Sequence, residues 1–389
     1  MPDRIDNDTW AAQWSVPVEV AEATRYTLQR ELYHTWNSPR TQIDTGTIYL
    51  FPGHLQRPGA TGMYLLEKMG TDLTPLPKEL QFLISSTSCQ HRVEFFGVPS
   101  TERAIQEEFV MGVSTIPCLV YYDGRAMYLG CCQGLGIAGG RYTHTEGEDI
   151  REDERGRAQV EFSIPADWRH VGLLPVKDLP GSWWWPDVGG CEVYTTWADL
   201  CEIRFARSMG WHVEVMEKIT WPEARPLDLW AQRLSKLYLK AKGEGNDVLT
   251  SCYRSIALHT IGRLHNLGYR DDRRTVAADD PRATFDAVES LGPDGATIRT
   301  RERVDKPERE CHPEWSAAIW SKTHLRVAKA LMSVPRETVL AVRGDAIYLT
   351  GDPGWGDDGR CGILRWKGQW DGPLLAPRNW NDLKALTSG

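Results

Sequence analysis

The sequence lacks any apolar run that approaches the roughly 18 residues needed for a membrane-spanning helix. Its amino end, MPDRIDNDTW, also lacks the charged and then apolar pattern of a secretory signal peptide. From these two absences we expect a cytoplasmic protein that has no membrane partner.

A CxxC pair is missing as well. The nine cysteines are an odd number, and two of them, Cys131 and Cys132, are adjacent. Reduced thiols fit this pattern better than a disulfide framework or a zinc site does. We therefore expect neither disulfides nor a structural metal.

The sequence has no excess of positive charge, and its net charge is -8. Proteins bind phosphate through lysine and arginine, so this balance argues at first against a nucleic-acid partner. The charges are unevenly distributed, however. Between Arg225 and Arg263 seven residues are basic and three are acidic, while acids concentrate in EGEDIREDE near residue 150 and in 271–310. The basic segment fits either a nucleic-acid surface or an ordinary solvated helix face.

Two helices joined by a short turn are expected in this basic segment. The 389 residues, 41% of them hydrophobic, suffice for one large core or two ordinary ones. Apolar residues recur at helical spacing over Leu227–Lys242, GEGN supplies a turn, and a second helix runs from about Asp247 to His265. Arg233, Lys236 and Lys240 would share one face of the first helix. A third helix is expected over Glu314–Met332.

Strands are expected at GTIYLF, VEFFGV, AQVEFSIP and HVEVMEKI, and CLVYY reads as a strand that ends at Asp123. The segment TVLAVRGDAIYLTG predicts a β-hairpin with Gly344 and Asp345 at its bend. Residues 269–311 are rich in charge, Pro and Gly without clear periodicity, which favours a long irregular insertion. The fold class expected is α+β with a mixed or antiparallel sheet backed by helices.

Asp123 and Asp345 each lie at the end of a β-prone run, and they would meet if their strands were neighbours in one sheet. Paired carboxylates hold divalent ions for phosphoryl transfer, where one ion activates the attacking hydroxyl and the other neutralises the leaving pyrophosphate. Magnesium prefers such oxygen ligands, and manganese is an alternative. Taken alone, an Asp at the end of a strand is more often a turn former.

Four segments, taken in order, resemble the motifs of family B DNA polymerases. The first, YYDGRAMYL, is similar to a palm motif in which an Asp is followed five residues later by a Tyr. The resemblance implies that Asp123 is a catalytic metal ligand and that the Gly124 backbone carbonyl also contacts metal. It also implies that Tyr128 binds the nucleotide as a steric gate against the ribose 2'-hydroxyl.

The stretch TTWADLCEIRFARSMGWHVEVMEKITW resembles the connection from palm to fingers, and the helical pair ending in RSIALHTIG resembles the fingers motif. Arg254 and Gly262 match the outer positions of that motif, while Leu258 stands where the family has Asn. The resemblance implies that Arg254 grips the triphosphate, with Lys240 and Lys236 as further nucleotide contacts.

The last motif, VRGDAIYLT, is similar to the second palm motif, in which two acids flank a Thr. Asp345 takes the second acid position, which implies a catalytic metal ligand, and Arg343 takes the first. Further on, GILRWKG resembles the segment that holds the primer terminus. This makes Lys367 a candidate for primer and template contact, although a solvated surface lysine is an equally good interpretation.

The resemblance covers roughly residues 113–389. It implies a right-hand palm with helical-hairpin fingers: palm over 113–220 and 269–389, fingers over 221–268, and an insertion at 269–311. Residues 1–112 would form a separate α/β domain, for which a degenerate exonuclease-like remnant is one interpretation. The nearest match to the exonuclease motif, Asp44-Thr45-Gly46, lacks the second acid, so proofreading is not expected. Too few residues follow Asp345 for a full thumb, so an accessory protein or an oligomer is expected to supply one.

The function expected is that of a DNA-directed DNA polymerase, which adds deoxynucleotides to a primed template with two magnesium ions. Two alternatives stay open. Arg343 and the altered fingers motif are compatible with a catalytically inactive, polymerase-like subunit that binds nucleic acid or acts as a scaffold. A primase-like or terminal-transferase-like nucleotidyltransferase would keep the chemistry without the same use of a template.

Overall fold

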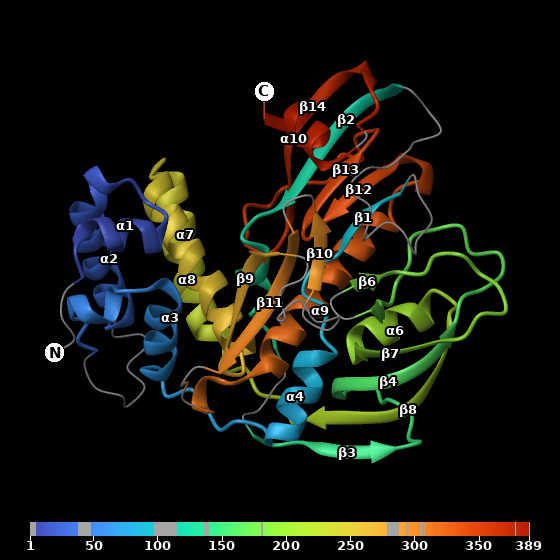
Figure 1. Ribbon diagram of the computed structural model, residues 1–389, viewed down its shortest axis with the longest axis horizontal. Helices are drawn as coiled ribbons and strands as arrows, with labels where there is room; N and C mark the ends of the chain where they lie inside the picture. The colour runs from blue at the N-terminus through green and yellow to red at the C-terminus, as the bar shows by residue number, and fades with distance from the viewer. Residues whose placement is uncertain are drawn as a thin grey trace.

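The computed structural model describes residues 5–37, 48–96, 115–135, 140–179, 182–277, 288–292, 295–303, 306, 308–377 and 379–388. Helices alone stand at the left of Figure 1, while antiparallel sheets with further helices packed among them make up the rest. The expected combination of helices with antiparallel sheet is confirmed. None of the described helices is both long and apolar enough to cross a membrane. All nine cysteines are free thiols, as expected.

A five-stranded sheet built from both halves of the chain carries Asp123 on β2 and Asp345 in the turn before β13. Its order is β1-β12-β13-β2-β14 and every pairing is antiparallel. The expected CLVYY strand and the expected β-hairpin are confirmed as β2 and as β12 with β13. The strands are β1 (Val93–Phe95), β2 (Thr115–Gly124), β12 (Val339–Arg343), β13 (Ala346–Leu349) and β14 (Leu364–Leu375).

Helices cover both faces of this sheet. The helix α9 (Pro313–Leu331) packs Val327 and Leu331 against one face, and α10 (Trp380–Ser388) packs Leu383 against the other. All four residues of β13 are consequently buried, which explains why VLAV and AIYL are continuously apolar rather than alternating. Helix α9 also confirms the helix expected over Glu314–Met332.

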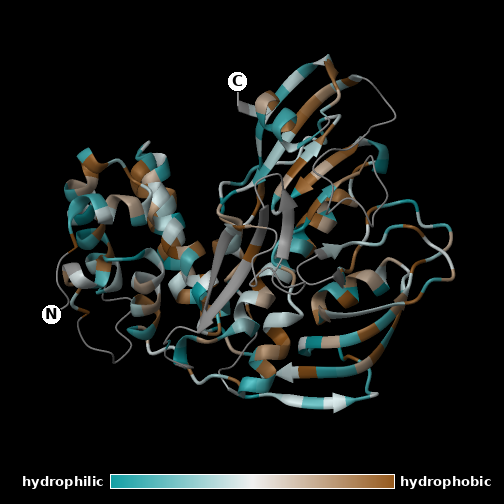
Figure 2. Ribbon diagram, viewed as in Figure 1, coloured by the Kyte–Doolittle hydropathy of each residue, from teal (hydrophilic) through white to brown (hydrophobic). Residues whose placement is uncertain are grey.

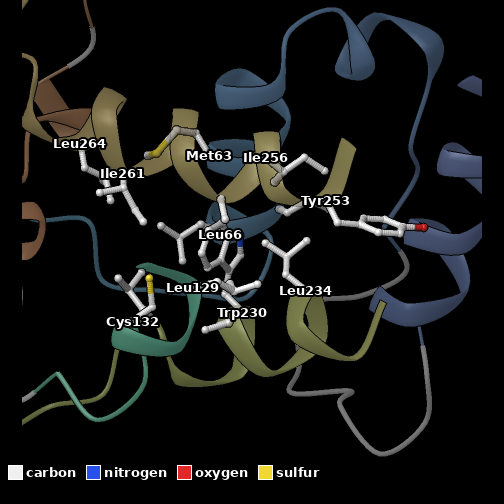
Figure 3. Close-up of a cluster of buried hydrophobic side chains, with 14 of the residues drawn as sticks. Met63, Leu66, Leu129, Cys132, Trp230, Leu234, Tyr253, Ile256, Ile261 and Leu264 are labelled. Carbon is white, nitrogen blue, oxygen red and sulfur yellow. The ribbon is translucent and has the colours of Figure 1, made fainter. Parts of the chain in front are cut away.

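The expected helical hairpin is confirmed as α7 (Asp228–Gly243) and α8 (Asp247–His265). Asn246 begins α8 by accepting a hydrogen bond from the backbone N–H of Leu249. Figure 3 shows side chains from α7, α8, α3 (Pro58–Glu67) and the short α5 (Met127–Cys131) converging on one core around Trp230. Gly62 permits α3 to approach α8 closely, because a Cβ there would lie 1.7 Å from Thr260 Oγ1.

The amino-terminal part differs from the expected α/β domain. Its described residues form helices α1 (Asn7–Trp14), α2 (Ala21–Trp36), α3 and α4 (Lys78–Ser86), and its one described strand, β1, belongs to the five-stranded sheet. The GTIYLF strand is wrong for residues 48–51. That segment is extended, but Asn37 and Gln29 of neighbouring α2 hydrogen-bond its backbone at Ile48 and Leu50 in place of a partner strand. The exonuclease candidate at 44–46 lies outside the described residues.

A four-stranded antiparallel sheet fills the lower right of Figure 1, in the order β3-β8-β4-β7. Its members are β3 (Thr143–Glu146), β4 (Arg155–Ser163), β7 (Tyr194–Asp199) and β8 (His212–Trp221), with α6 (Leu200–Ser208) between the last two. The strands expected at AQVEFSIP and HVEVMEKI are confirmed. In Figure 2, β3 is pale to teal along its length, which suits its place at the sheet edge. A small hairpin pairs β5 (Val176–Leu179) with β6 (Ser182–Trp184).

Contrary to our expectation of an irregular insertion, the described residues of 269–311 mostly form strands. These strands make a three-stranded antiparallel sheet of β9 (Tyr269–Val276), β10 (Val288–Gly292) and β11 (Gly295–Arg303). The backbone pairing of β9 with β11 is unbroken from Val276 opposite Ala296 to Tyr269 opposite Arg303. Hydrophobic periodicity missed these strands because charged residues occupy most of the positions that would otherwise show it.

Candidate active site

Asp123 and Asp345 are brought to the same end of two adjacent strands. Asp123 lies near the end of β2, and Asp345 directly precedes β13, whose Ile347 is paired with Tyr122. Gly124 provides the space for the second acid. A Cβ at Gly124 would lie 2.2 Å from Asp345 Oδ2, so the carboxyl group of Asp345 rests directly against this glycine.

The two acids influence each other electrostatically. Burial raises the pKa of Asp345 to about 6, and the negative charge of Asp123 adds to that shift. Burial also raises the pKa of Asp123, against the opposing charges of Lys367, Arg254 and Arg365. Two partly buried carboxylates that repel each other favour a bound cation, because a cation stabilises both charged forms at once.

Basic residues face this acidic pair from two sides. Arg254 is exposed on α8, while Arg365 and Lys367 come from β14. Lys367 occupies a β-bulge, where Trp366 pairs with Tyr122 and Gly368 with Tyr121. Burial lowers the pKa of Lys367, and the positive charges of Arg365, Lys242 and Arg254 act in the same direction. This concentration of positive charge beside the acids is suited to phosphate groups.

A cleft opens at Asp345. Tyr128, Arg254, Leu258 and Asp345 line both its inner and its outer part; we call it the Asp345 cleft. The inner part continues along Gly124, Ala126, Met127, Leu129 and Ala257, and the outer part along His91, Val93, Ile261, Trp320 and Arg343. The predicted residues Asp123, Gly124, Tyr128, Arg254, Asp345 and Lys367 are therefore gathered in or beside one region.

Tyr128 reaches the cleft through a tight backbone turn after β2. Ala126, at the start of α5, has a φ of 42°, in the left-handed region that residues other than glycine rarely adopt. The chain thereby reverses and places Tyr128 in the cleft, with its hydroxyl 3.2 Å from His91 Nδ1. Leu129 and Cys131 on the same short helix are buried in the core and hold it in place.

The structure does not bring Lys240 and Lys236 into the Asp345 cleft. Lys240 lies on the side of α7 that faces α2, where its Nζ is 2.8 Å from Glu31 Oε1. Lys236 is exposed to solvent. The expected basic face is wrong for Arg233, which is buried with its guanidinium 5.3 Å from the centre of the Trp36 ring. Helical spacing placed these residues together without revealing that α2 covers that face.

Arg343 and three further residues complete the surroundings. The guanidinium of Arg343 lies 5.3 Å from the centre of the Trp380 ring, at the edge of the outer cleft. Sequence reasoning missed His91, Arg365 and Lys242. Arg365 had a usable signal, because it lies in the same basic strand segment as Lys367. His91 had none, since it comes from an amino-terminal segment far from every motif.

The residues present fit magnesium better than zinc. Among the described residues, no group of three or more His, Cys, Asp and Glu side chains gathers to hold a metal. Magnesium is commonly bound by one or two carboxylates together with substrate phosphates. Asp123 and Asp345 match that requirement, whereas a zinc site would need more protein ligands.

No family model matches this chain, and no curated protein matches it either. Its fold is similar to solved structures of Phi29 DNA polymerase. The complex of that polymerase with primer-template DNA and incoming nucleotide has a TM-score of 0.57 and 10% identity, and the match covers 81% of this chain and 53% of that one. An orthorhombic crystal form has a TM-score of 0.58 and 10% identity, and the match covers 94% and 64%. The chain thus spans less than two thirds of that polymerase, and the likeness shows a DNA-polymerase-like fold.

Proposed function

We propose that this protein is a template-directed DNA polymerase that extends a primer at the Asp345 cleft. The observation that carries the proposal is the meeting of Asp123 and Asp345 on adjacent strands, opposite Arg254. In this assignment the five-stranded sheet is the palm and the α7 and α8 hairpin is the fingers. The likeness to Phi29 DNA polymerase supports both the fold and a primed DNA template as partner.

The proposed cofactor is magnesium, with manganese as an alternative. Asp123 and Asp345 would hold it, together with the backbone carbonyl of Gly124. When bound, two such ions would lower the pKa of the primer hydroxyl and neutralise charge on the leaving pyrophosphate. The protein contributes the position of the two carboxylates, and their mutual repulsion makes the empty pair less stable than the loaded one.

Other residues of the cleft bind and orient the substrates. Arg254 is exposed toward the cleft and can hold two phosphate oxygens of the incoming triphosphate with its planar guanidinium. Arg365 and Lys367 lie beside Asp123, where they would contact backbone phosphates of the primer. The ring of Tyr128 would lie against the sugar, while Leu258 gives the cleft an apolar wall. The absence of proofreading and the need for a partner that supplies thumb function remain predictions.

Primer extension tests the proposal directly. A labelled primer on a DNA template is incubated with magnesium, four deoxynucleotides and the purified parent, Asp123→Asn, Asp345→Asn or Asp167→Asn. We expect extension by the parent and a loss of about 100-fold or more in each of the first two variants, the scale for removing a charged transition-state contact. Asp167 is exposed in a turn outside the cleft, so its variant should retain parental activity. Parental rates in Asp345→Asn would contradict the assignment.

The same assay separates the alternative functions. A protein that binds primed DNA but extends it under no metal condition would be the inactive, polymerase-like subunit. Extension of a single-stranded primer in the absence of template would indicate a terminal-transferase-like activity. Products that follow the template sequence, made only when a template is present, support the polymerase.

A further inference from the structure

His91 enters the Asp345 cleft from a part of the chain that carries none of the polymerase-like motifs. It lies in the short segment between α4 and β1, and the segment is fixed directly after His91. The backbone N–H of Gly344 donates to the Arg92 carbonyl at 2.7 Å, and Val93 is paired with Arg343 in the sheet. The neighbouring Arg92 is buried in an ion pair with Glu94. The imidazole of His91 therefore has a defined place beside the turn that carries Asp345.

The His91 side chain connects this turn to Tyr128. Its Nδ1 is 3.2 Å from the Tyr128 hydroxyl, and the two ring centres are 6.5 Å apart in an edge contact. A Cβ placed at Gly344 would lie 4.0 Å from the same Nδ1. His91 thus stands between the tyrosine proposed to contact the sugar and the turn proposed to hold metal, and it lines the outer cleft.

The protonation states fit a hydrogen bond from tyrosine to histidine. Burial, with the negative charge of Asp345, raises the pKa of Tyr128, so its hydroxyl keeps its proton and can donate. His91 is exposed at the cleft, where partial desolvation lowers its pKa, and the positive charges of His324 and Arg343 lower it further. A neutral imidazole that accepts through Nδ1 carries its proton on Nε2.

We infer that His91 is a positioning residue for sugar selection, which rests on the function proposed above. By accepting a hydrogen bond from the Tyr128 hydroxyl, His91 holds the tyrosine ring across the floor of the cleft. A nucleotide with a 2'-hydroxyl would collide with the ring there. Tyr128 lies on a helix of only five residues that begins in a left-handed conformation. The hydrogen bond to His91 supplies a tether from a separate part of the fold. Without it the ring can move aside and admit a ribonucleotide.

A double-mutant cycle tests this inference. Selectivity is the ratio of kcat/KM for a deoxynucleotide to that for the matching ribonucleotide, measured for the parent, His91→Ala, Tyr128→Phe and the double variant. We expect each single variant to lower selectivity about tenfold, the scale of one hydrogen bond, mainly through better use of the ribonucleotide. The double variant should lose no more than either single variant, because both remove the same contact. Selectivity at the parental level in His91→Ala, or losses that add up in the double variant, would overturn the inference.

Two further variants separate positioning from folding. His91→Gln retains an acceptor oxygen and should recover part of the selectivity. His212→Ala removes an exposed histidine at the start of β8 and should leave selectivity unchanged. Thermal unfolding of all variants is measured in parallel, and His91→Ala is expected to fold as the parent does.

Binding of dATP and ATP in the presence of magnesium is measured beside incorporation. A parent that extends no primer would contradict the proposed function. The ratio of the two dissociation constants would still report on His91. The same ratio in the parent and His91→Ala would then reject the positioning role independently of catalysis.

Discussion

The two sides of the helical hairpin use their basic residues in opposite ways. On the cleft side, Arg254 is exposed, and within the described part of the chain no salt bridge engages it. On the side toward α2, Lys240 is bound to Glu31, which also accepts a hydrogen bond from Tyr253 at 2.5 Å. The local excess of basic residues is therefore not one binding surface. One part is free to meet a ligand, and the other part fastens the hairpin to the amino-terminal helices.

Among the variants that test this comparison, Arg254→Ala should have the largest effect on activity. We expect Arg254→Ala to lower kcat/KM for nucleotide incorporation by about 100-fold, because a doubly hydrogen-bonded charge contact to phosphate is lost. Its thermal stability should match the parent, since the side chain is exposed. Arg254→Lys should recover part of the activity through charge alone. Single-nucleotide incorporation kinetics measure this effect. An unchanged kcat/KM in Arg254→Ala would show that the cleft side of the hairpin does not bind the nucleotide through this residue.

His265, at the buried end of α8, should give the next largest effect, on stability alone. Burial lowers its pKa from 6.5 to about 4, and the positive charge of Lys306 adds to the shift. The unfolded chain therefore takes up this proton at a higher pH than the folded protein does. As the pH falls from 6.5 toward 4, stability should decrease, by about 3 kcal/mol in total.

Denaturant titrations at neutral and mildly acidic pH measure this loss. His265→Phe keeps a ring that can pack near Trp320, which lies 4.5 Å from the His265 ring centre, and it cannot be protonated. The variant should lose less stability than the parent over the same pH range. An identical pH dependence in both proteins would show that His265 is not the responsible group.

Glu31→Gln tests the side of the hairpin that contacts α2 and should have a smaller effect on stability. Burial alone would raise the pKa of Glu31, but the hydrogen bonds from Lys240 and Tyr253 outweigh it and the pKa is lowered. The stabilisation is therefore present above the ordinary value of 4.5 and is lost as the pH falls below it. Near neutral pH we expect the variant to lose about 1 kcal/mol of unfolding free energy, a modest figure because Lys240 is half exposed.

The matching kinetic measurement makes the comparison sharper. Glu31→Gln should have the parental kcat/KM, because Glu31 lies outside the Asp345 cleft. In acid the stability of the variant and the parent should converge. A large loss of incorporation with stability unchanged would place the α2 side of the hairpin in substrate binding after all.

Lys236→Ala should have the smallest effect of all. The side chain is exposed and outside the cleft, so we expect kcat/KM to stay within twofold and unfolding free energy within about 0.5 kcal/mol of the parent. Incorporation kinetics and denaturant unfolding measure both. A rise in KM for the nucleotide would restore Lys236 as the nucleotide contact that its sequence position predicted.

Local patterns in the sequence predicted local structure well. The helical hairpin was found because apolar spacing and the GEGN turn act over a few residues. Asp123 and Asp345 were expected to meet if their strands were neighbours, and the pairing of β2 with β13 meets that condition. The periodicity of α7 placed Arg233, Lys236 and Lys240 on one face but carried no information about what covers that face. The sequence also gave no sign of α2 as the partner, because that contact joins residues about two hundred positions apart.

The remaining differences have separate physical causes. Residues 48–51 are rich in β-prone side chains, yet the side chains of Gln29 in α2 and of Asn37 at its end hydrogen-bond their backbone groups. In 269–311 the ladder of backbone hydrogen bonds makes a sheet from a segment whose charge hides its period. His91 reaches the cleft only through the pairing of β1 with β12, which no pattern within either segment predicts.

The contact between Gly124 and Asp345 offers a way to inactivate the site without replacing any charged residue. A single methyl group at position 124 would compete for the space that the carboxyl oxygen occupies. Such a variant keeps every ionisable group of the site, including the basic side chains proposed to contact DNA. It would be a suitable inactive variant for capturing substrate complexes. An aspartate replacement is less suitable, because it changes the electrostatic potential that substrates meet.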